Sequence, residues 1–381
     1  MQITYPDYYK EFSCTADKCR DTCCAGWGIV IDDNTLKKYH KGKGAFGRRL
    51  RKEINWKEKT FCQNAGRCAF LNERNLCDIY MQLGKEAFCD TCRRYPRHIE
   101  EFENLREISL SLSCPEAAEI ILSRKEKVQF ITTQRDSKEE SYEDFDFFLF
   151  DKLEEARGFL LELLQNRNYR IEYRMGAALG FVHDLQRRIR SQAIFQIDEL
   201  IGRYQAQDTM ERIGRKLEVY KKAGRKTTLL DKMMEALESL EVLNTEFPRY
   251  VQKSRYILYE RGDIWYQSKR RLFQEENPLF EIVMEQLMVY FVFTYFCGAV
   301  YDNNAYTKMK MAFLSTLLIR EWMMAVWIKE GKQSDISPIV EISYRYSREL
   351  EHSDFNLNTM EEMLGKNPLF SMKNLLTVLI N

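Results

Sequence analysis

The sequence predicts a mainly α-helical protein with a small, irregular, cysteine-rich α+β domain in its N-terminal part. Two observations support this fold class. Ten of the eleven cysteines lie between Cys14 and Cys114, and this segregation calls for one physical cause. Beyond residue 142, apolar residues recur at the three- and four-residue steps of amphipathic helices. We therefore expect a cysteine-rich metal-binding domain over residues 1–123, a linker or loop over 124–142, and an α-helical bundle over 143–381.

The composition excludes some classes of protein. The chain of 381 residues is long enough to bury a large core, and 58 Lys and Arg against 57 Asp and Glu leave a net charge of +1. This balance lacks the basic signature of a nucleic-acid-binding protein, so we expect no nucleic-acid partner. The first residues have neither the basic flank nor the apolar core of a signal peptide. The uncharged run from Gln286 to Tyr301 is short for a membrane span and indicates a buried helix, so we expect a soluble cytoplasmic protein.

The first cysteines are closely spaced along the chain. The pattern Cys14-x4-Cys19-x3-Cys23-Cys24 is followed by Ala25-Gly26-Trp27-Gly28. The two glycines that flank the tryptophan indicate a tight turn close to whatever these cysteines hold. After a short β-prone run over residues 29–31, the polar residues 33–35 predict the start of a helix that continues to residue 40.

The next cysteines follow the pattern of a short hairpin. The polar residues 72–75 form a turn between two arms, and these arms carry Cys68 and Cys77. A helix over about residues 81–88 is then expected to deliver Cys89 and Cys92.

The last cysteine of the N-terminal part follows a strand pattern. Apolar and serine residues alternate strictly from Ile108 to Ser113, which predicts a half-buried strand ending next to Cys114. Pro115 suits the first turn of a helix that continues to about Ser123.

The remainder of the chain is helical in pattern, with no βαβ rhythm and no internal repeat. Three prolines, at 278, 338 and 368, lie close to expected helix starts. The expected helices cover residues 145–164, 171–189, 194–220, 229–243, 279–300, 306–329, 338–350 and 360–380.

The cysteines favour a metal site over a disulfide framework. A reducing compartment keeps thiols reduced, and clustered cysteines there more often bind metal. With four histidines in the whole chain, the ligands are expected to be mainly thiolates, which suit zinc or an iron–sulfur cluster. The pairs are untidy for one structural zinc, and neighbouring side chains such as Cys23 and Cys24 diverge. Spacing alone leaves open two zinc ions, or one iron–sulfur cluster with the remaining thiols packing or holding a second ion.

Three segments resemble the flagellin lysine-N-methylase family (FliB-like). They are Cys19-Arg20-Asp21-Thr22-Cys23-Cys24-Ala25-Gly26-Trp27, the run from Thr91 to Phe102 (TCRRYPRHIEEF), and the run from Ser109 to Glu116 (SLSLSCPE). The arm Cys68-x-Phe70-Leu71 … Cys77-x-Ile79-Tyr80 is similar to a broader group of zinc- or iron-chelating cysteine domains. The resemblance covers about residues 5–120.

The resemblance implies a function and a set of metal ligands. It implies transfer of methyl groups from S-adenosylmethionine to lysine ε-amines of flagellin, with a 4Fe–4S cluster in the cysteine-rich part. Cys62 and Cys89 are tied less firmly to the family pattern than the other cysteines. The positions that match it are Cys14, Cys19, Cys23, Cys24, Cys68, Cys77, Cys92 and Cys114.

The cofactor site carries no motif of its own. The Gly-rich loop of doubly wound methyltransferases is missing, and the spacing of the radical enzymes, Cys-x3-Cys-x2-Cys, is not present. Arg97, His98 and Trp27 are candidate cofactor contacts because they lie beside the cysteines, and the catalytic residue stays unknown. We expect the cofactor and substrate to meet where the two domains join. The alternative function is a non-enzymatic protein that binds or delivers zinc or iron.

Overall fold

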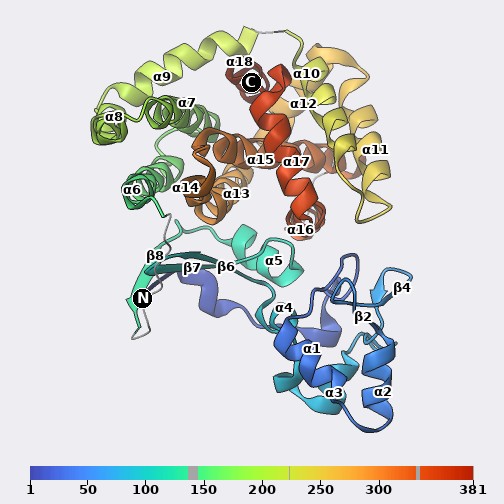
Figure 1. The fold of residues 1–381 in the computed structure, drawn as a ribbon. Helices are drawn as coiled ribbons and strands as arrows, with labels where there is room; N and C mark the ends of the chain where they lie inside the picture. Colours follow the sequence, from blue (N-terminus) through green and yellow to red (C-terminus); the bar gives the residue numbers. More distant parts are fainter. Residues whose placement is uncertain (136–144, 223, 332–334, 381) are drawn as a thin grey trace.

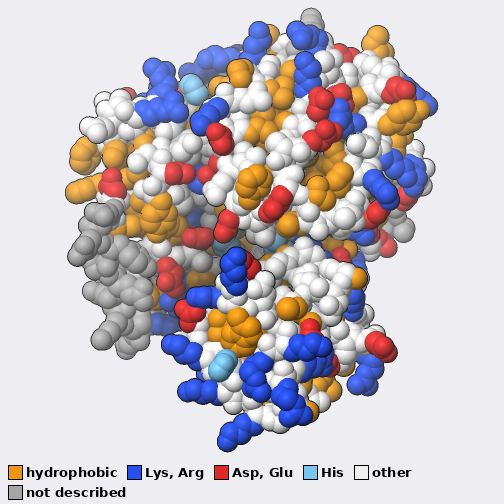
Figure 2. Space-filling view, turned by 45° about the vertical axis from the view of Figure 1, so that its right-hand side comes forward, with side chains coloured by type: hydrophobic (Ala, Val, Ile, Leu, Met, Phe, Trp, Pro, Cys, Tyr) orange, Lys and Arg blue, Asp and Glu red, His pale blue; other side chains and the backbone are white. Residues whose placement is uncertain are grey.

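The computed structural model describes residues 1–135, 145–222, 224–331 and 335–380. As predicted, the protein is mainly helical. In Figure 1 the helical domain lies above, and a four-stranded sheet and a cysteine-rich lobe (residues 14–95) lie side by side beneath it. Figure 2 shows a waist between the lobe and the helical domain, with Lys and Arg side chains gathered over the lobe.

The sheet combines strands from distant parts of the chain. Its order is β6 (Arg97–Phe102), β7 (Leu105–Leu110), β1 (Gln2–Pro6) and β8 (Phe130–Gln134). Strand β1 is parallel to β7 and antiparallel to β8, while β6 and β7 form a hairpin.

Two details of the sheet differ from the sequence analysis. The expected strand over 108–113 lies earlier, as β7, because the hairpin begins at Leu105 and the chain leaves the ladder after Leu110. Strand β8 lies within the segment expected to be a linker. Its side chains are mostly exposed, so it is held by backbone pairing to β1 rather than by an apolar face. Its sequence therefore lacks the alternation of apolar and polar residues that predicts a strand. Residues 136–142 of that segment lie outside the described residues.

The cysteine-rich lobe is built from short elements. The helix expected at residues 33–40 is present, and the Asp32 carboxylate caps it by accepting a hydrogen bond from the backbone N–H of Thr35 at 2.9 Å. The helix expected at 81–88 is divided, because the chain turns at Gly84 with φ +79°. The elements are α1 (Asp33–His40), α2 (Gly44–Lys52), β2 (Ile54–Asn55), β3 (Thr60–Phe61), β4 (Gln63–Asn64), β5 (Arg67–Cys68), α3 (Asp78–Leu83) and α4 (Asp90–Arg94).

The lobe has a small hydrophobic core of its own. Phe70 and Cys89 are completely buried in it, and Tyr39 and Phe61 pack beside them. The sheet and helix α5 (Pro115–Ser123) instead share their core with the helical domain, where Leu110 and Ala117 are fully buried. The protein therefore has two hydrophobic cores, and the chain passes from one to the other between β6 and the lobe.

The helical domain surrounds two long central helices. By length and composition, the segments 280–302 and 305–330 could cross a membrane. In an apolar window of 18 residues within each segment, however, 83% and 89% of the residues are buried inside the protein. They are core helices, as expected for the run 286–301. The helices are α6 (Phe147–Leu164), α7 (Ile171–Arg190), α8 (Ile197–Gln205), α9 (Thr209–Leu217), α10 (Lys226–Glu235), α11 (Phe247–Tyr259), α12 (Gly262–Glu276), α13 (Phe280–Tyr295), α14 (Ala299–Asp302), α15 (Ala305–Glu330), α16 (Ser337–Glu351), α17 (Asp354–Lys366) and α18 (Met372–Leu379).

Besides the segment 279–300, which is divided between α13 and α14, two expected helices are broken in the structure. The segment 194–220 forms α8 and α9, and the segment 360–380 is divided between α17 and α18. The second break lies at Pro368, which cannot continue a helix because it lacks a backbone N–H and its ring clashes with the preceding turn.

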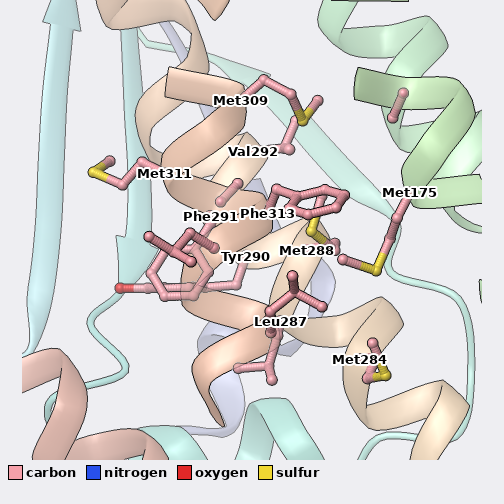
Figure 3. Close-up of a cluster of buried hydrophobic side chains, with 14 of the residues drawn as sticks. Met175, Met284, Leu287, Met288, Tyr290, Phe291, Val292, Met309, Met311 and Phe313 are labelled. Carbon is pink, nitrogen blue, oxygen red and sulfur yellow. The ribbon is translucent and has the colours of Figure 1, made fainter. Parts of the chain in front are cut away.

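Side chains of α13 form the centre of the helical core. Figure 3 shows Met284, Leu287 and Met288 facing Met175 of α7 and Phe313 of α15. The ring of Tyr290 lies at the edge of this cluster with its hydroxyl pointing away from it. This hydroxyl leaves the apolar core and reaches polar groups next to the lobe.

Buried ion pairs join the sheet to the helices. Arg157 of α6 forms a bidentate ion pair with Glu107 of β7, and both side chains are 5% exposed. Glu285 of α13 is fully buried between Arg174 at 2.6 Å and Arg167 at 2.8 Å. These charges are paired, so their desolvation is offset by charge-assisted hydrogen bonds.

Candidate functional site

The described cysteines fall into two sets that meet at Cys23 and Cys24. We call Cys14, Cys19, Cys23 and Cys114 the first set. Burial raises the pKa of Cys114 to about 11, and the neighbouring thiols of Cys19 and Cys14 add to the rise. The pKa of Cys23 is raised by its hydrogen bond with Cys24, by burial, and by the charges of Cys114 and Cys14. Thiols far apart in the sequence therefore lie close enough to influence one another.

The second set lies in the core of the lobe and comprises Cys24, Cys68, Cys77, Cys89 and Cys92. Cys68 and Cys89 are buried there, and the other three pack against the same core. The backbone N–H of Cys68 donates to the carbonyl of Cys24 at 2.8 Å. Burial raises the pKa of Cys68 to about 12, with Cys24, Cys77 and Cys89 contributing. Cys89, the less firmly matched cysteine, is thus a member of this set.

The two remaining cysteines lie elsewhere. Cys62 is held by backbone hydrogen bonds to Glu53 and Ala69. Cys297 is buried in the helical core, where burial raises its pKa to about 12 and the nearby Arg157 opposes the rise.

The thiols suit metal binding in kind and number. All eleven cysteines are free thiols, so no disulfide framework is formed. The first set contains four thiols, the number of sulfur ligands that a 4Fe–4S cluster or a structural zinc requires. Among the described residues, no three Cys, His, Asp or Glu side chains stand close enough together to hold an ion as they are placed. The kind and number of donor atoms in the first set suit a 4Fe–4S cluster or a zinc ion. Binding of either would require the four thiols to move closer together.

A ring stack joins the lobe to the end of α16. The rings of Trp27 and His352 have centroids 4.3 Å apart, and Tyr95 packs beside both, at 6.0 Å and 5.9 Å. The indole N–H of Trp27 donates to the carbonyl of Cys23 at 2.8 Å. His352 Nε2 lies 2.9 Å from the hydroxyl of Ser113, which precedes Cys114. The stack therefore contacts the chain next to two members of the first set.

Arg348 closes the same junction from the preceding turn of α16. Its guanidinium donates to the backbone carbonyls of Ser113 at 3.0 Å and Asp21 at 3.1 Å, and pairs with the Asp21 carboxylate at 2.8 Å. Burial and this guanidinium lower the pKa of His352 to about 3. His352 is therefore neutral near pH 7 and can accept or donate one hydrogen bond to Ser113. We call Trp27, Tyr95, Ser113, Arg348 and His352 the junction.

Glu351 lies beside the junction with its hydrogen bonds satisfied. It accepts from Ser347 at 2.6 Å and from the hydroxyl of Tyr290 at 2.7 Å, and the Tyr290 oxygen accepts from the backbone N–H of Leu112 at 3.1 Å. Burial raises the pKa of the Glu351 carboxyl. The network ties α13 and α16 to the strand exit that precedes Cys114.

The three candidate cofactor contacts occupy different places. Trp27 is part of the junction. His98 lies 2.8 Å from Glu100 and packs near the ring of Tyr295 at 5.7 Å. Arg97 donates to the hydroxyl of Tyr9 at 3.1 Å, so the N-terminal segment engages it. Their role in cofactor binding stays a prediction.

Sequence reasoning missed Arg348, Glu351 and His352. They lie at the end of an ordinary amphipathic helix, and neither their spacing nor their composition forms a motif. The one available signal is indirect: helix α16 ends in a basic, acidic and histidine-containing turn that its apolar face does not require.

A family model, the FliB lysine N-methylase C-terminal domain, matches residues 157–378. The chain belongs to the FliB lysine N-methylase family. The match covers the C-terminal part of α6, α7 to α17 and nearly all of α18, so it includes the central helices and the residues of α16 that reach the lobe. The broader group of cysteine domains stays a prediction.

Curated proteins that are similar to this chain come from Salmonella. The lysine-N-methylases of Salmonella typhimurium strain LT2 and Salmonella choleraesuis are each 34% identical over 132 residues, which is 32% of this chain and 33% of theirs. The flagellar biosynthetic protein FliU of Salmonella muenchen is 35% identical over 132 residues, or 78% of its length. The matched region thus spans about a third of the two curated lysine-N-methylases. No solved structure matches the chain.

Proposed function

We propose that this protein methylates lysine ε-amines of flagellin in the cytoplasm, with S-adenosylmethionine as methyl donor. The observation that carries the proposal is the family assignment over residues 157–378. The names of the relatives, lysine-N-methylase and flagellar biosynthetic protein, support methylation of lysine and a substrate connected with the flagellum.

The chemistry makes two demands on the protein. The lysine nitrogen must lose its proton before it can attack, and it must be held in line with the bond between the methyl carbon and the sulfur. In the reaction the C–N bond forms, the C–S bond breaks with its electron pair remaining on sulfur, and a base takes the ammonium proton. A buried carboxylate whose pKa is raised suits the role of this base, because near neutral pH it can hold the proton that it takes from the ammonium.

We also propose that the first set of cysteines holds a 4Fe–4S cluster. Cys14, Cys19, Cys23 and Cys114 supply four thiols from two separate stretches of the chain. A bound cluster would supply a cross-link between the loop of residues 14–24 and the start of α5. The junction supports this arrangement, because Arg348 and His352 already hold the backbone on both sides of the set.

One experiment tests the activity and the cluster together. The full chain is purified anaerobically, its iron and sulfide are measured, and transfer of labelled methyl groups from S-adenosylmethionine to flagellin is followed. We expect about four iron atoms per chain, and methyl incorporation into lysine. Iron-loaded protein that transfers no methyl group to flagellin would refute the proposed activity.

A matched pair of variants tests the ligands. Cys114→Ser removes a member of the first set and should lose the iron. Cys62→Ser, which lies in neither set, should keep it. Equal iron content in both variants would contradict the assignment of the first set, whereas zinc in place of iron would favour the non-enzymatic or structural alternatives.

A further inference from the structure

A cavity lies on α16 away from the junction residues. It is lined by residues of α11, α15 and α16 and of the segment before α11, and its volume is about 290 Å³. The residues that shape it are Phe247, Tyr250, Trp322, Glu341, Arg345 and Glu349. Glu341, Arg345 and Glu349 follow one another at steps of four, so one stripe of α16 faces the cavity.

The inner wall is aromatic. The ring of Trp322 lies 5.8 Å from that of Phe247 and 5.9 Å from that of Tyr250, measured between centroids. Trp322 is 0% exposed, so this wall belongs to the core and is held in place by α15. Aromatic faces carry partial negative charge and attract organic cations.

Two polar groups in this wall are left unused. The indole N–H of Trp322 and the hydroxyl of Tyr250 have no hydrogen-bond partner among the described residues. A buried polar group without a partner is costly, and native proteins leave few of them unless water or a ligand completes the site. A ligand that reaches these two buried groups would complete their hydrogen bonds.

The charged side chains that line the cavity are mainly acidic. Glu246, Glu330, Glu341 and Glu349 line it with Arg345, which pairs with Glu341 at 2.6 Å, while Arg249 and Lys329 outside the lining pair with Glu246 at 3.3 Å and Glu330 at 2.8 Å. Glu349 is fixed by the backbone N–H groups of Leu243 and Asn244, at 2.9 Å and 2.6 Å. Burial raises the pKa of Glu349 to about 7. Together the side chains present negative charge to an entering ligand.

We propose that this cavity binds an organic cation carried on an apolar or aromatic body. The proposal rests on the proposed function, in which both reactants have this chemistry: the sulfonium of S-adenosylmethionine and the ammonium of a lysine side chain. The aromatic wall contacts the body of the ligand, the glutamates face its charge, and the free Tyr250 hydroxyl and Trp322 N–H take up its polar groups. Helix α16 then has two roles, with the cavity on one side and the cysteine lobe on another.

Binding to the anaerobically purified full chain tests the proposal. The probes are S-adenosylmethionine, its neutral thioether S-adenosylhomocysteine, a short peptide with one lysine, and the same peptide with norleucine. We expect one of the two cations to bind about tenfold more tightly than its uncharged counterpart. The pair that shows the difference identifies the ligand.

Conservative variants locate the binding. Tyr250→Phe, Trp322→Phe and Glu349→Gln should each weaken the same cation about fivefold to tenfold. Tyr256→Phe is the matched control, because Tyr256 is an exposed tyrosine of the same helix and does not line this cavity. Thermal unfolding of each variant shows that the fold is retained, and Tyr250→Phe is the safest, because it removes a hydroxyl without a partner.

The outcomes separate this proposal from the proposed function. If all three cavity variants bind every probe with wild-type affinity and still methylate flagellin, the proposed cavity site is wrong and the proposed activity stands. Weaker cation binding in the variants of a protein that transfers no methyl group would keep the cavity and overturn the activity. A cation and its neutral counterpart that bind equally would overturn the charge argument.

Discussion

Trp27 and His352, 325 positions apart in the sequence, stack with their ring centroids 4.3 Å apart. One ring follows the first cysteines and the other ends α16. Their hydrogen bonds go to Cys23, a member of the first set, and to Ser113, the neighbour of Cys114. The stack thus connects the cysteine lobe to the helix that also lines the acidic cavity.

Removing this stack should loosen the lobe. Trp27→Ala loses the ring contact and the hydrogen bond to Cys23, which together are worth about 1–3 kcal/mol. We expect faster proteolysis and faster amide exchange in residues 14–95, with little change in the helical domain. His40→Ala, an exposed histidine of the lobe, is the control. Uniform destabilisation of both parts would contradict an interface role for the stack.

The docking of the lobe should weaken in acid. Burial and Arg348 lower the pKa of His352 from 6.5 to about 3. Between these values the unfolded or undocked state binds a proton that the docked state does not, so stability falls as the pH falls through this range. Arg348 faces the same ring and opposes its protonation. Amide exchange in the lobe measured from pH 7 to pH 4 should show this opening, and His352→Gln, which keeps a hydrogen-bonding group without the titration, should reduce its pH dependence.

The buried pair of Arg157 and Glu107 should be essential to the joint between sheet and helices. Glu107→Gln leaves the arginine charge buried without its partner, which costs about 3–5 kcal/mol. Denaturant unfolding should show a lower midpoint. Glu362→Gln, which removes an exposed pair with Lys366, should leave the midpoint nearly unchanged, because solvent screens that pair. Similar effects of the two substitutions would contradict this account.

Cation binding in the cavity should strengthen as the pH rises. Burial raises the pKa of Glu349 from 4.5 to about 7, so the carboxyl is largely protonated at pH 6 and charged at pH 8. Because the folded protein holds this proton more tightly than the unfolded chain does, the free energy of unfolding decreases as the pH rises from 4.5 towards 7. A bound cation offsets this decrease by pairing with the charged carboxylate. Affinity for the cationic probe should therefore increase between pH 6 and pH 8, and the increase should be smaller in Glu349→Gln. An equal increase in both proteins would assign the effect to another group.

Periodicity predicted the central helices closely. The helices expected at 171–189, 306–329 and 338–350 appear as Ile171–Arg190, Ala305–Glu330 and Ser337–Glu351. In these segments buried residues recur at helical steps, or, in α15, nearly all round the helix, so the pattern extends over the whole element. Strand β8 and the division of the lobe helix at Gly84 were missed, because a polar edge strand and a single glycine turn leave little periodic signal.

The sequence by itself determined that ten cysteines are confined to one part of the chain, that the rest is helical, and to which family it belongs. Only the tertiary structure decided that Cys114 joins Cys14, Cys19 and Cys23, that Cys89 lies with Cys68 and Cys77, and that α16 faces both a cavity and the lobe. Residue spacing constrains contacts within a turn or two. Contacts across hundreds of residues arise from packing, because α16 is positioned by the buried faces of α15, α5 and α17, which no local pattern in its own sequence encodes.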